Sequence, residues 1–244
     1  MVTGYEPLNT LKPVGEDIWI VDGPAIRFYG MPFSTRMTVV RLQNGDLWLH
    51  SPTQFDDTLA NSLGSLGRVA FLIAPNWIHY AHIQAWQAAF PDAQAYAAPG
   101  VAKRALSRGL DISFDHDLRV DRAEIGWIDQ IDQLVVQGSR IHHEAVFFHR
   151  ASRTLVLTDL IENFEASHIP WWMRLLAKPA HILAPDGQMP RDMRATFRGR
   201  YAKLREAVQQ MIEWGPERII IAHGRWFEED AEHELRRAFY FVLK

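Results

Sequence analysis

Three apolar segments of the chain each lead to side chains that could bind a metal ion. Residues 69–74 precede Asn76 and His79, residues 155–158 end at Asp159, and residues 219–222 end at His223. Polar groups at the carboxyl ends of strands are where α/β proteins usually assemble ligand and metal sites. Imidazole nitrogens and carboxylate oxygens are ligands for zinc and iron. Three such strand ends indicate a site more strongly than a single histidine does.

The composition narrows the chemistry that is available to these residues. The chain has 244 residues and no cysteine, so disulfides, thiolate metal sites and a cysteine nucleophile are excluded. Any metal must be held by histidine, aspartate, glutamate or asparagine. The net charge of −3 offers no basic excess for binding nucleic acid.

The chain also lacks sequence features of export or membrane insertion. No apolar stretch is long enough to span a bilayer, and the first residues lack the regions of a signal peptide. We therefore expect a cytoplasmic protein whose partner is a small-molecule substrate or ligand, with no nucleic-acid or membrane partner. The oligomeric state stays open.

The predicted elements form two groups of strands, each followed by an α/β stretch. The Asn44-Gly45 pair between two apolar runs predicts a hairpin, because these residues accept the positive φ of a tight turn. Strands are predicted at 17–22, 38–42, 47–50, 69–74, 94–97, 124–128, 134–136, 145–149, 154–158 and 218–222. Helices are predicted at 55–66, 80–89, 101–108, 191–214 and 228–242, with a short amphipathic segment at 170–178. This order predicts one domain over residues 1–244, with two sheets and outer helices.

In this order of elements the chain resembles the metallo-β-lactamase-like hydrolase superfamily. In that superfamily an early strand ends in an HxHxDH motif, a middle strand carries an isolated histidine, a later strand ends in Gly-Asp, and a late strand ends in histidine. Asp159, after Thr158, is similar to the aspartate of the third motif, and His223, before Gly224, is similar to the late histidine. The resemblance implies an α/β fold, a four-layer αββα sandwich with two mixed sheets and outer helices.

The first motif departs from the family pattern and allows two registers. In the family, a Phe-Pro pair often lies eleven and twelve residues after the last histidine of the motif, and Phe90-Pro91 has this spacing from His79. His79 is then the last histidine and Asn76 the central one, while Ala74 and Ile78 replace the first histidine and the aspartate. The Phe-Pro spacing favours this register.

The alternative register makes His82 the last histidine and His79 the central one. In either register at least two of the usual ligands are replaced. His142 and His143 precede the strand that should follow the isolated histidine, and both are candidates for that ligand.

The resemblance implies a reduced site that holds one divalent metal ion. His79, Asp159 and His223 would bind the metal and leave a position for water, with His142 as a fourth ligand. Zinc is the first expectation, with iron or manganese as alternatives. Asn76 would orient water beside the catalytic Asp159, although an asparagine at this position is also a typical helix cap. The implied reaction is hydrolysis of an ester, amide, thioester or phosphodiester.

Two other functions compete with a metallohydrolase. The replaced motif positions also suit a catalytically silent domain that holds no metal and binds a small molecule or a protein. A serine hydrolase has weaker support, since Ser51 lies outside any GxSxG motif. His50 beside it is expected to be a buried, hydrogen-bonded residue.

Overall fold

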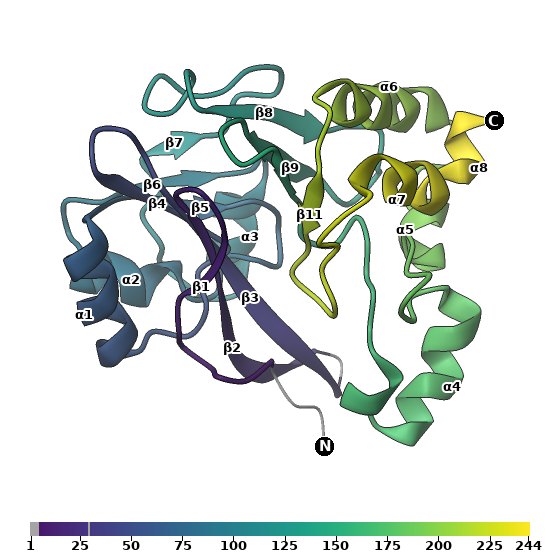
Figure 1. The fold of residues 1–244 in the computed structure, drawn as a ribbon, viewed down its shortest axis with the longest axis horizontal. Coiled ribbons are helices and arrows are strands. Elements are labelled where there is room, and N and C mark those ends of the chain that lie inside the picture. Colours follow the sequence, from purple (N-terminus) through teal and green to yellow (C-terminus); the bar gives the residue numbers. More distant parts are fainter. Residues whose placement is uncertain (1–4, 29) are drawn as a thin grey trace.

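The computed structural model of the protein describes residues 5–28 and 30–244, and it contains two β-sheets packed against each other (Figure 1). The larger sheet has the strand order β1-β2-β3-β4-β5-β6-β7, and the smaller has the order β11-β10-β9-β8. The strands of the larger sheet are β1 (Lys12–Gly15), β2 (Ile18–Phe28), β3 (Met31–Arg41), β4 (Asp46–His50), β5 (Arg68–Ala74), β6 (Gln94–Ala97) and β7 (His116–Asp117). The smaller sheet contains β8 (Ile131–Val136), β9 (Glu144–His149), β10 (Thr154–Val156) and β11 (Arg218–Ile220).

Both sheets are mixed. Strands β1 to β4 pair in antiparallel fashion, whereas β4 to β7 are parallel because helical crossovers connect them. In the smaller sheet only the pair β10 and β11 is parallel. The parallel strands β5, β10 and β11 therefore deliver the segments that follow them to one edge of the molecule.

Helices cover the outer face of each sheet (Figure 1). They are α1 (Asp57–Leu66), α2 (Ile83–Ala89), α3 (Val101–Ser107), α4 (Trp171–Ala180), α5 (Arg191–Thr196), α6 (Tyr201–Glu213), α7 (Ala231–Ala238) and α8 (Tyr240–Leu243), with a 3-10 turn at Ala166–His168. Buried residues of α1 and α2 join the core of the larger sheet, and those of α6, α7 and α8 join the core of the smaller sheet. The expected four-layer αββα sandwich is confirmed.

The larger core continues between the sheets through aromatic rings. Trp48 of β4, Phe147 of β9 and Trp127 are fully buried there, and the ring centroid of Trp48 lies 4.9 Å from that of Phe147. Edge-to-face contacts of this kind fix the relative position of two sheets more specifically than aliphatic packing does.

The predicted strand at 124–128 is wrong. The backbone turns there: the N–H of Trp127 donates to the carbonyl of Glu124 at 3.0 Å, and the Glu124 carboxylate accepts from the N–H of Arg119 at 2.8 Å. The apolar residues that suggested a strand divide between the core, where Trp127 lies, and the surface, where Ile125 is exposed.

Two long helices of the prediction are each divided in the structure. The segment 191–214 forms α5 and α6, separated at Gly199, which has a φ of 80°. Left-handed backbone at this residue cannot continue a right-handed helix. The segment 228–242 starts as α7 only after Asp230, whose φ of 54° is also left-handed, and it is divided from α8 at Phe239, where φ is −113° and ψ is 19°.

Candidate metal centre

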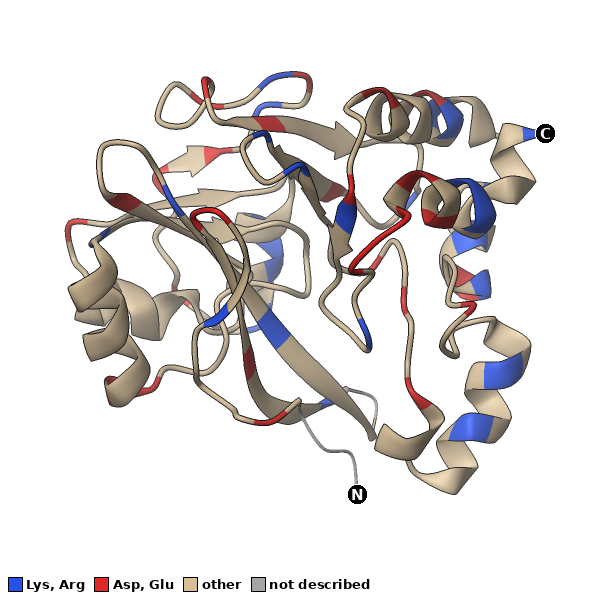
Figure 2. Cartoon of the chain, in the orientation of Figure 1, with Lys and Arg blue, Asp and Glu red and all other residues tan. Residues whose placement is uncertain are grey.

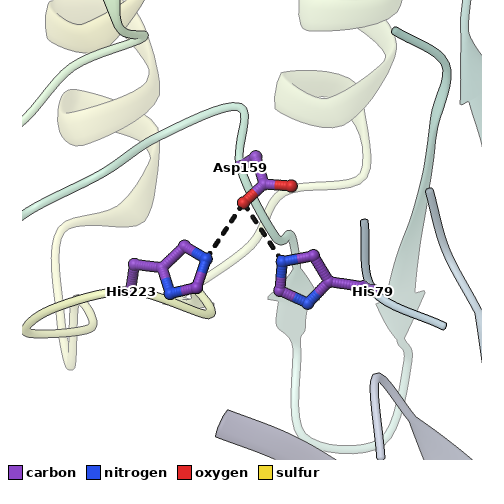
Figure 3. A group of neighbouring side chains, drawn as sticks. All are labelled: His79, Asp159 and His223. Atoms are coloured by element: carbon purple, nitrogen blue, oxygen red, sulfur yellow. Dashed lines mark hydrogen bonds and ion pairs between the residues drawn. The ribbon is translucent and has the colours of Figure 1, made fainter. Parts of the chain in front are cut away.

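Three of the predicted ligands meet at the sheet edge. Figure 3 shows the imidazoles of His79 and His223 on either side of the Asp159 carboxylate. The Nε2 atoms of His79 and His223 each lie 3.2 Å from the same oxygen, Oδ1 of Asp159. One ligand atom from each residue lies within 4.8 Å of the others, so the group could hold a metal ion. The structure thus brings His79, Asp159 and His223 together.

The second ring nitrogen of each imidazole also has a hydrogen-bond partner. Nδ1 of His223 lies 2.7 Å from the carbonyl oxygen of Ser34, to which it donates. Nδ1 of His79 lies 2.7 Å from Oγ of Ser51. A histidine that ligates a metal usually has its other nitrogen held in this way, because the contact orients the ring. Both rings therefore direct Nε2 to the shared oxygen.

Asn76 connects the His79 turn to Asp159. Its Oδ1 accepts the backbone N–H groups of Ile78 at 2.9 Å and His79 at 3.0 Å, as a capping side chain does. Its Nδ2 donates to Oδ2 of Asp159 at 2.6 Å and to Oγ1 of Thr158 at 2.8 Å. The amide leaves Oδ1 of Asp159 for the imidazoles, so Asn76 acts by orienting the carboxylate.

A fully buried carboxylate positions Asp159 from the other side. Oε1 of Glu144 accepts from the N–H of Thr158 at 2.7 Å, and Oε2 accepts from the N–H of Asp159 at 2.9 Å. The same Oε2 lies 3.2 Å from Nε2 of His142, and the indole N–H of Trp77 donates to Nδ1 of His142 at 2.8 Å. Both nitrogens of His142 are thus engaged.

His142 consequently belongs to a second group, with Glu144 and Asp159, rather than to the group around His223. In this second group the Glu144 oxygens already accept backbone N–H groups. We interpret its role as support for Asp159. His82, the alternative last histidine, lies half-buried at the start of α2, outside both groups.

The loop that carries His223 is held by a buried arginine. Nη1 of Arg36 donates to the carbonyls of Ile221 at 2.8 Å and Gly224 at 2.9 Å, on either side of His223. Gly224 has a φ of 92°, and a Cβ there would lie 2.1 Å from the carbonyl oxygen of Asn163. Only glycine fits this close approach, which explains the His-Gly pair at the strand end.

Asp159 and the two imidazoles shift one another's protonation. Burial opposes ionisation of Asp159, but the adjacent imidazoles of His79 and His223 hold the pKa of its carboxyl well below the usual value. Burial likewise opposes a charge on His223, yet the hydrogen bond and charge of Asp159 raise the pKa of this imidazole. The site therefore attracts positive charge, either a proton on His223 or a cation between the three groups.

Two further titratable groups lie around this centre. Burial, aided by the charge of His79, lowers the pKa of His50 to about 3, and His50 stays neutral. Contrary to expectation, its Nε2 has no hydrogen-bond partner among the described residues. Burial raises the pKa of Glu162, near His223 and Asp159, to about 8.

The sequence indicated no role for Ser34, Glu144 or Glu162, and it gave only weak support to Ser51 as a nucleophile. Glu144 is polar at the start of an otherwise apolar strand, which is a detectable signal. Ser34 contributes a backbone carbonyl, which has no sequence signature. Ser51 has a φ of 53°, an uncommon value for a serine, and this places its hydroxyl against His79.

We expect Ser51→Ala to weaken metal binding about 10- to 100-fold, because Nδ1 of His79 loses its partner. A competition titration with a chromophoric chelator measures this affinity. Ser65→Ala is the matched control, since this exposed hydroxyl donates to the carbonyl of Asn61 in α1, away from the site. Equal affinities for Ser51→Ala and the unaltered protein would contradict the assigned role.

We expect Glu162→Gln to stabilise the metal-free protein at alkaline pH but not at pH 5. With a pKa of about 8 in the folded protein, against 4.5 ordinarily, folding favours the protonated carboxyl. The stabilising contribution of the protonated Glu162 carboxyl is therefore fully present below pH 4.5, and it is lost as the pH rises through 8. Since Glu162 is only half-buried, we expect a gain on the order of 1–2 kcal/mol at pH 9 for the variant. Urea unfolding in the presence of chelator at pH 5 and pH 9 measures this effect. Glu229→Gln, at an exposed position, is the control. If the difference in unfolding free energy between Glu162→Gln and the unaltered protein does not grow with pH, the prediction is wrong.

Comparison with known proteins agrees with this architecture. The sequence profile of the family described as "Domain of unknown function (DUF4336)" matches residues 16–200. A search of curated proteins found no sequence match.

Solved structures of metallo-β-lactamases resemble the chain over almost its whole length. A metallo-β-lactamase from Pontibacter korlensis is 11% identical, with a TM-score of 0.64 over 96% of this chain and 99% of that one. DIM-1 metallo-β-lactamase exposed to ceftazidime is 14% identical, with a TM-score of 0.67 over 96% of each chain. FIM-1 from Pseudomonas aeruginosa, in its mono-zinc form, is 14% identical, with a TM-score of 0.64 over 96% of each chain. The chain therefore belongs to the family of unknown function DUF4336 and has the metallo-β-lactamase fold.

Proposed function

We propose that this protein is a metal-dependent hydrolase with one divalent cation bound by His79, Asp159 and His223. The observation that carries the proposal is the approach of two imidazole Nε2 atoms to one carboxylate oxygen, each at 3.2 Å. Because Nδ1 of His223 donates to a carbonyl, the Nε2 of the neutral ring presents a lone pair to that oxygen. A cation at this point removes the repulsion and satisfies all three ligands.

The donor set suits zinc first, with iron or manganese as alternatives, because two imidazoles and one carboxylate are accepted by all three metals. Three protein ligands leave a coordination position open. A divalent metal bound there would lower the pKa of a water ligand and polarise a substrate carbonyl or phosphoryl oxygen. We propose an ester, amide, thioester or phosphodiester as the substrate.

The chain's own groups would prepare the site for such a reaction. Asn76 and Glu144 keep the Asp159 carboxylate in one orientation, so that little reorganisation is needed on binding. The Glu162 carboxyl, with its pKa of about 8, holds a proton at neutral pH in the metal-free site. A divalent cation in the centre would lower this pKa and favour release of the proton.

The reduced motif supports one metal rather than two. Ala74 and Ile78, which replace two motif ligands in the register that the Phe-Pro spacing favours, have no side-chain ligand atoms, and Asn76 donates to Asp159. His142 is held by Trp77 and Glu144. The groups that would build a second centre are thus replaced or engaged.

Metal analysis of protein purified without an affinity tag tests this proposal. After incubation with zinc, iron(II) or manganese and gel filtration, we expect about one equivalent of one metal to remain bound. His79→Ala and His223→Ala should each lose it, whereas His82→Ala, the matched control outside the group, should retain it.

Hydrolytic activity should depend on the bound metal. Assays with ester, thioester, amide and phosphodiester substrates should show a hydrolysis that a chelator abolishes and the metal restores. Less than about a tenth of an equivalent of every metal would overturn the proposal and favour a silent binding domain.

A further inference from the structure

Helix α4 presents an apolar face to solvent. The exposed fractions are 71% for Trp171, 66% for Leu175, 56% for Leu176 and 38% for Trp172. Single exposed apolar residues are ordinary on protein surfaces, but four on one ten-residue helix form a patch that needs an explanation.

The opposite face of the same helix is already used for packing. Met173 and Ala177 are buried in a small cluster with Phe33, Phe164, Ile169 and Ile182. With about 3.6 residues per turn, positions 171, 172, 175 and 176 lie on the side away from this cluster. The exposed residues are therefore not the margin of a core, because the core-facing residues of α4 are distinct from them.

The charges around the patch are basic. Arg174 and Lys178 are the ionisable residues of α4, and residues 166–185 contain no aspartate or glutamate. Figure 2 shows blue segments and no red on α4, in contrast to the mixed colours of the neighbouring helices. Residues 166–200 carry six basic and two acidic residues, in a chain with a net charge of −3.

We propose that the outer face of α4 binds the surface of a bilayer that contains anionic lipids. Exposed tryptophans and leucines beside lysine and arginine are the composition of helices that lie in a membrane interface. The rings and leucine side chains would enter the headgroup region, while Lys178 and Arg174 meet the lipid phosphates. Among the described residues no helix is long and apolar enough to cross a bilayer, so this contact is peripheral.

This inference revises the expectation that the protein has no membrane partner. That expectation came from the lack of a spanning segment, a criterion that does not address binding at the surface. The inference also stands apart from the proposed hydrolase function, because it uses none of the metal-binding residues.

The patch is nevertheless connected to the site. Phe33 and Phe164, which pack with the buried face of α4, both contact the imidazole of His223, with ring centroids 5.1 and 6.3 Å away. A bilayer against α4 would thus lie next to the wall of the site.

Vesicle flotation of the full-length protein tests the proposal. Vesicles of phosphatidylcholine with about 30% phosphatidylglycerol are compared with vesicles of phosphatidylcholine alone. We expect binding to the anionic vesicles that decreases at high salt. Trp171→Ala with Leu175→Ala should reduce it at least about tenfold, and Lys178→Gln about fivefold.

The control is Leu106→Ala, which removes an exposed leucine from α3, away from α4. It should bind like the unaltered protein, and circular dichroism should show that all variants are folded. Failure to bind anionic vesicles, or binding that Trp171→Ala with Leu175→Ala leaves unchanged, overturns the proposal. A dimer in light scattering that the same double variant dissociates would assign the face to a second copy instead, and would overturn it as well.

Discussion

Glu144→Gln is expected to lower the free energy of unfolding by about 2–4 kcal/mol and to disturb the metal centre. The carboxylate is fully buried and accepts three N–H groups, from Thr158, Asp159 and His142. Nδ1 of His142 accepts from Trp77, so its Nε2 carries the proton that points at Glu144. A glutamine amide has one oxygen, and its NH₂ group cannot accept. At least one buried donor is therefore left unsatisfied.

The same substitution should weaken metal binding about tenfold or more, because the backbone N–H of Asp159 loses its charged hydrogen-bond acceptor. Urea unfolding measures the first effect, and chelator competition measures the second. Glu217→Gln is the control for loss of a carboxylate, since this side chain is 55% exposed and paired with Arg153 at the surface. A Glu144→Gln protein as stable as the Glu217→Gln protein would show that the buried carboxylate does not hold the strand end.

Arg36→Met is expected to cost about 3–5 kcal/mol, the range for breaking a buried ion pair. Nε of Arg36 donates to Oδ1 of Asp22 at 2.9 Å, and both side chains are buried. Methionine fills much of the volume but leaves Asp22 with Lys12 alone and leaves the carbonyls of Ile221 and Gly224 without this donor. The loop that carries His223 should move, and metal affinity should fall together with stability.

Arg41→Met provides the matched comparison for this result. Arg41 pairs with Asp17 at the surface, where the exposed fractions are 42% for the Arg41 side chain and 35% for the Asp17 side chain. Such pairs contribute about 0–1 kcal/mol. Adding Asp22→Asn to Arg36→Met should recover part of the loss, because it removes a buried carboxylate that has lost one of its two cationic partners. Equal effects of Arg36→Met and Arg41→Met on the free energy of chemical unfolding would contradict the role of Arg36 in holding the His223 loop.

Glu144→Gln and Arg36→Met remove contacts that position different residues of the candidate site. Glu144 holds the carboxylate ligand from inside the smaller sheet, while Arg36 reaches from β3 of the larger sheet to the His223 loop. The three candidate ligands follow strands of both sheets, so the distances between them depend on how the sheets pack. Interactions that cross between the sheets, such as the hydrogen bond from Arg36 to Ile221, therefore determine whether three ligands can share one ion.

Much of the fold was predictable because its signals are local. The Asn44-Gly45 turn, the apolar run before Asn76 and the helical spacing of residues 55–66 each depend on neighbours in the chain, and all three elements are found. Predictions failed where tertiary contacts override the local pattern. Trp127 is buried from a turn rather than from a strand, and Gly199 divides what the periodicity suggested was one helix.

The sequence by itself determined the ligand types at the ends of three strands and the absence of any thiolate, and it thereby indicated the fold and a histidine–aspartate centre. Only the tertiary structure decided that His79 rather than His82 faces Asp159, that Asn76 is an orienting group, and that His142 belongs to a separate group. The physical reason is that strand-end residues are specified locally, whereas their facing atoms depend on the packing of two sheets and on contacts as distant in sequence as Ser34 with His223. Such contacts leave no periodic trace in the chain.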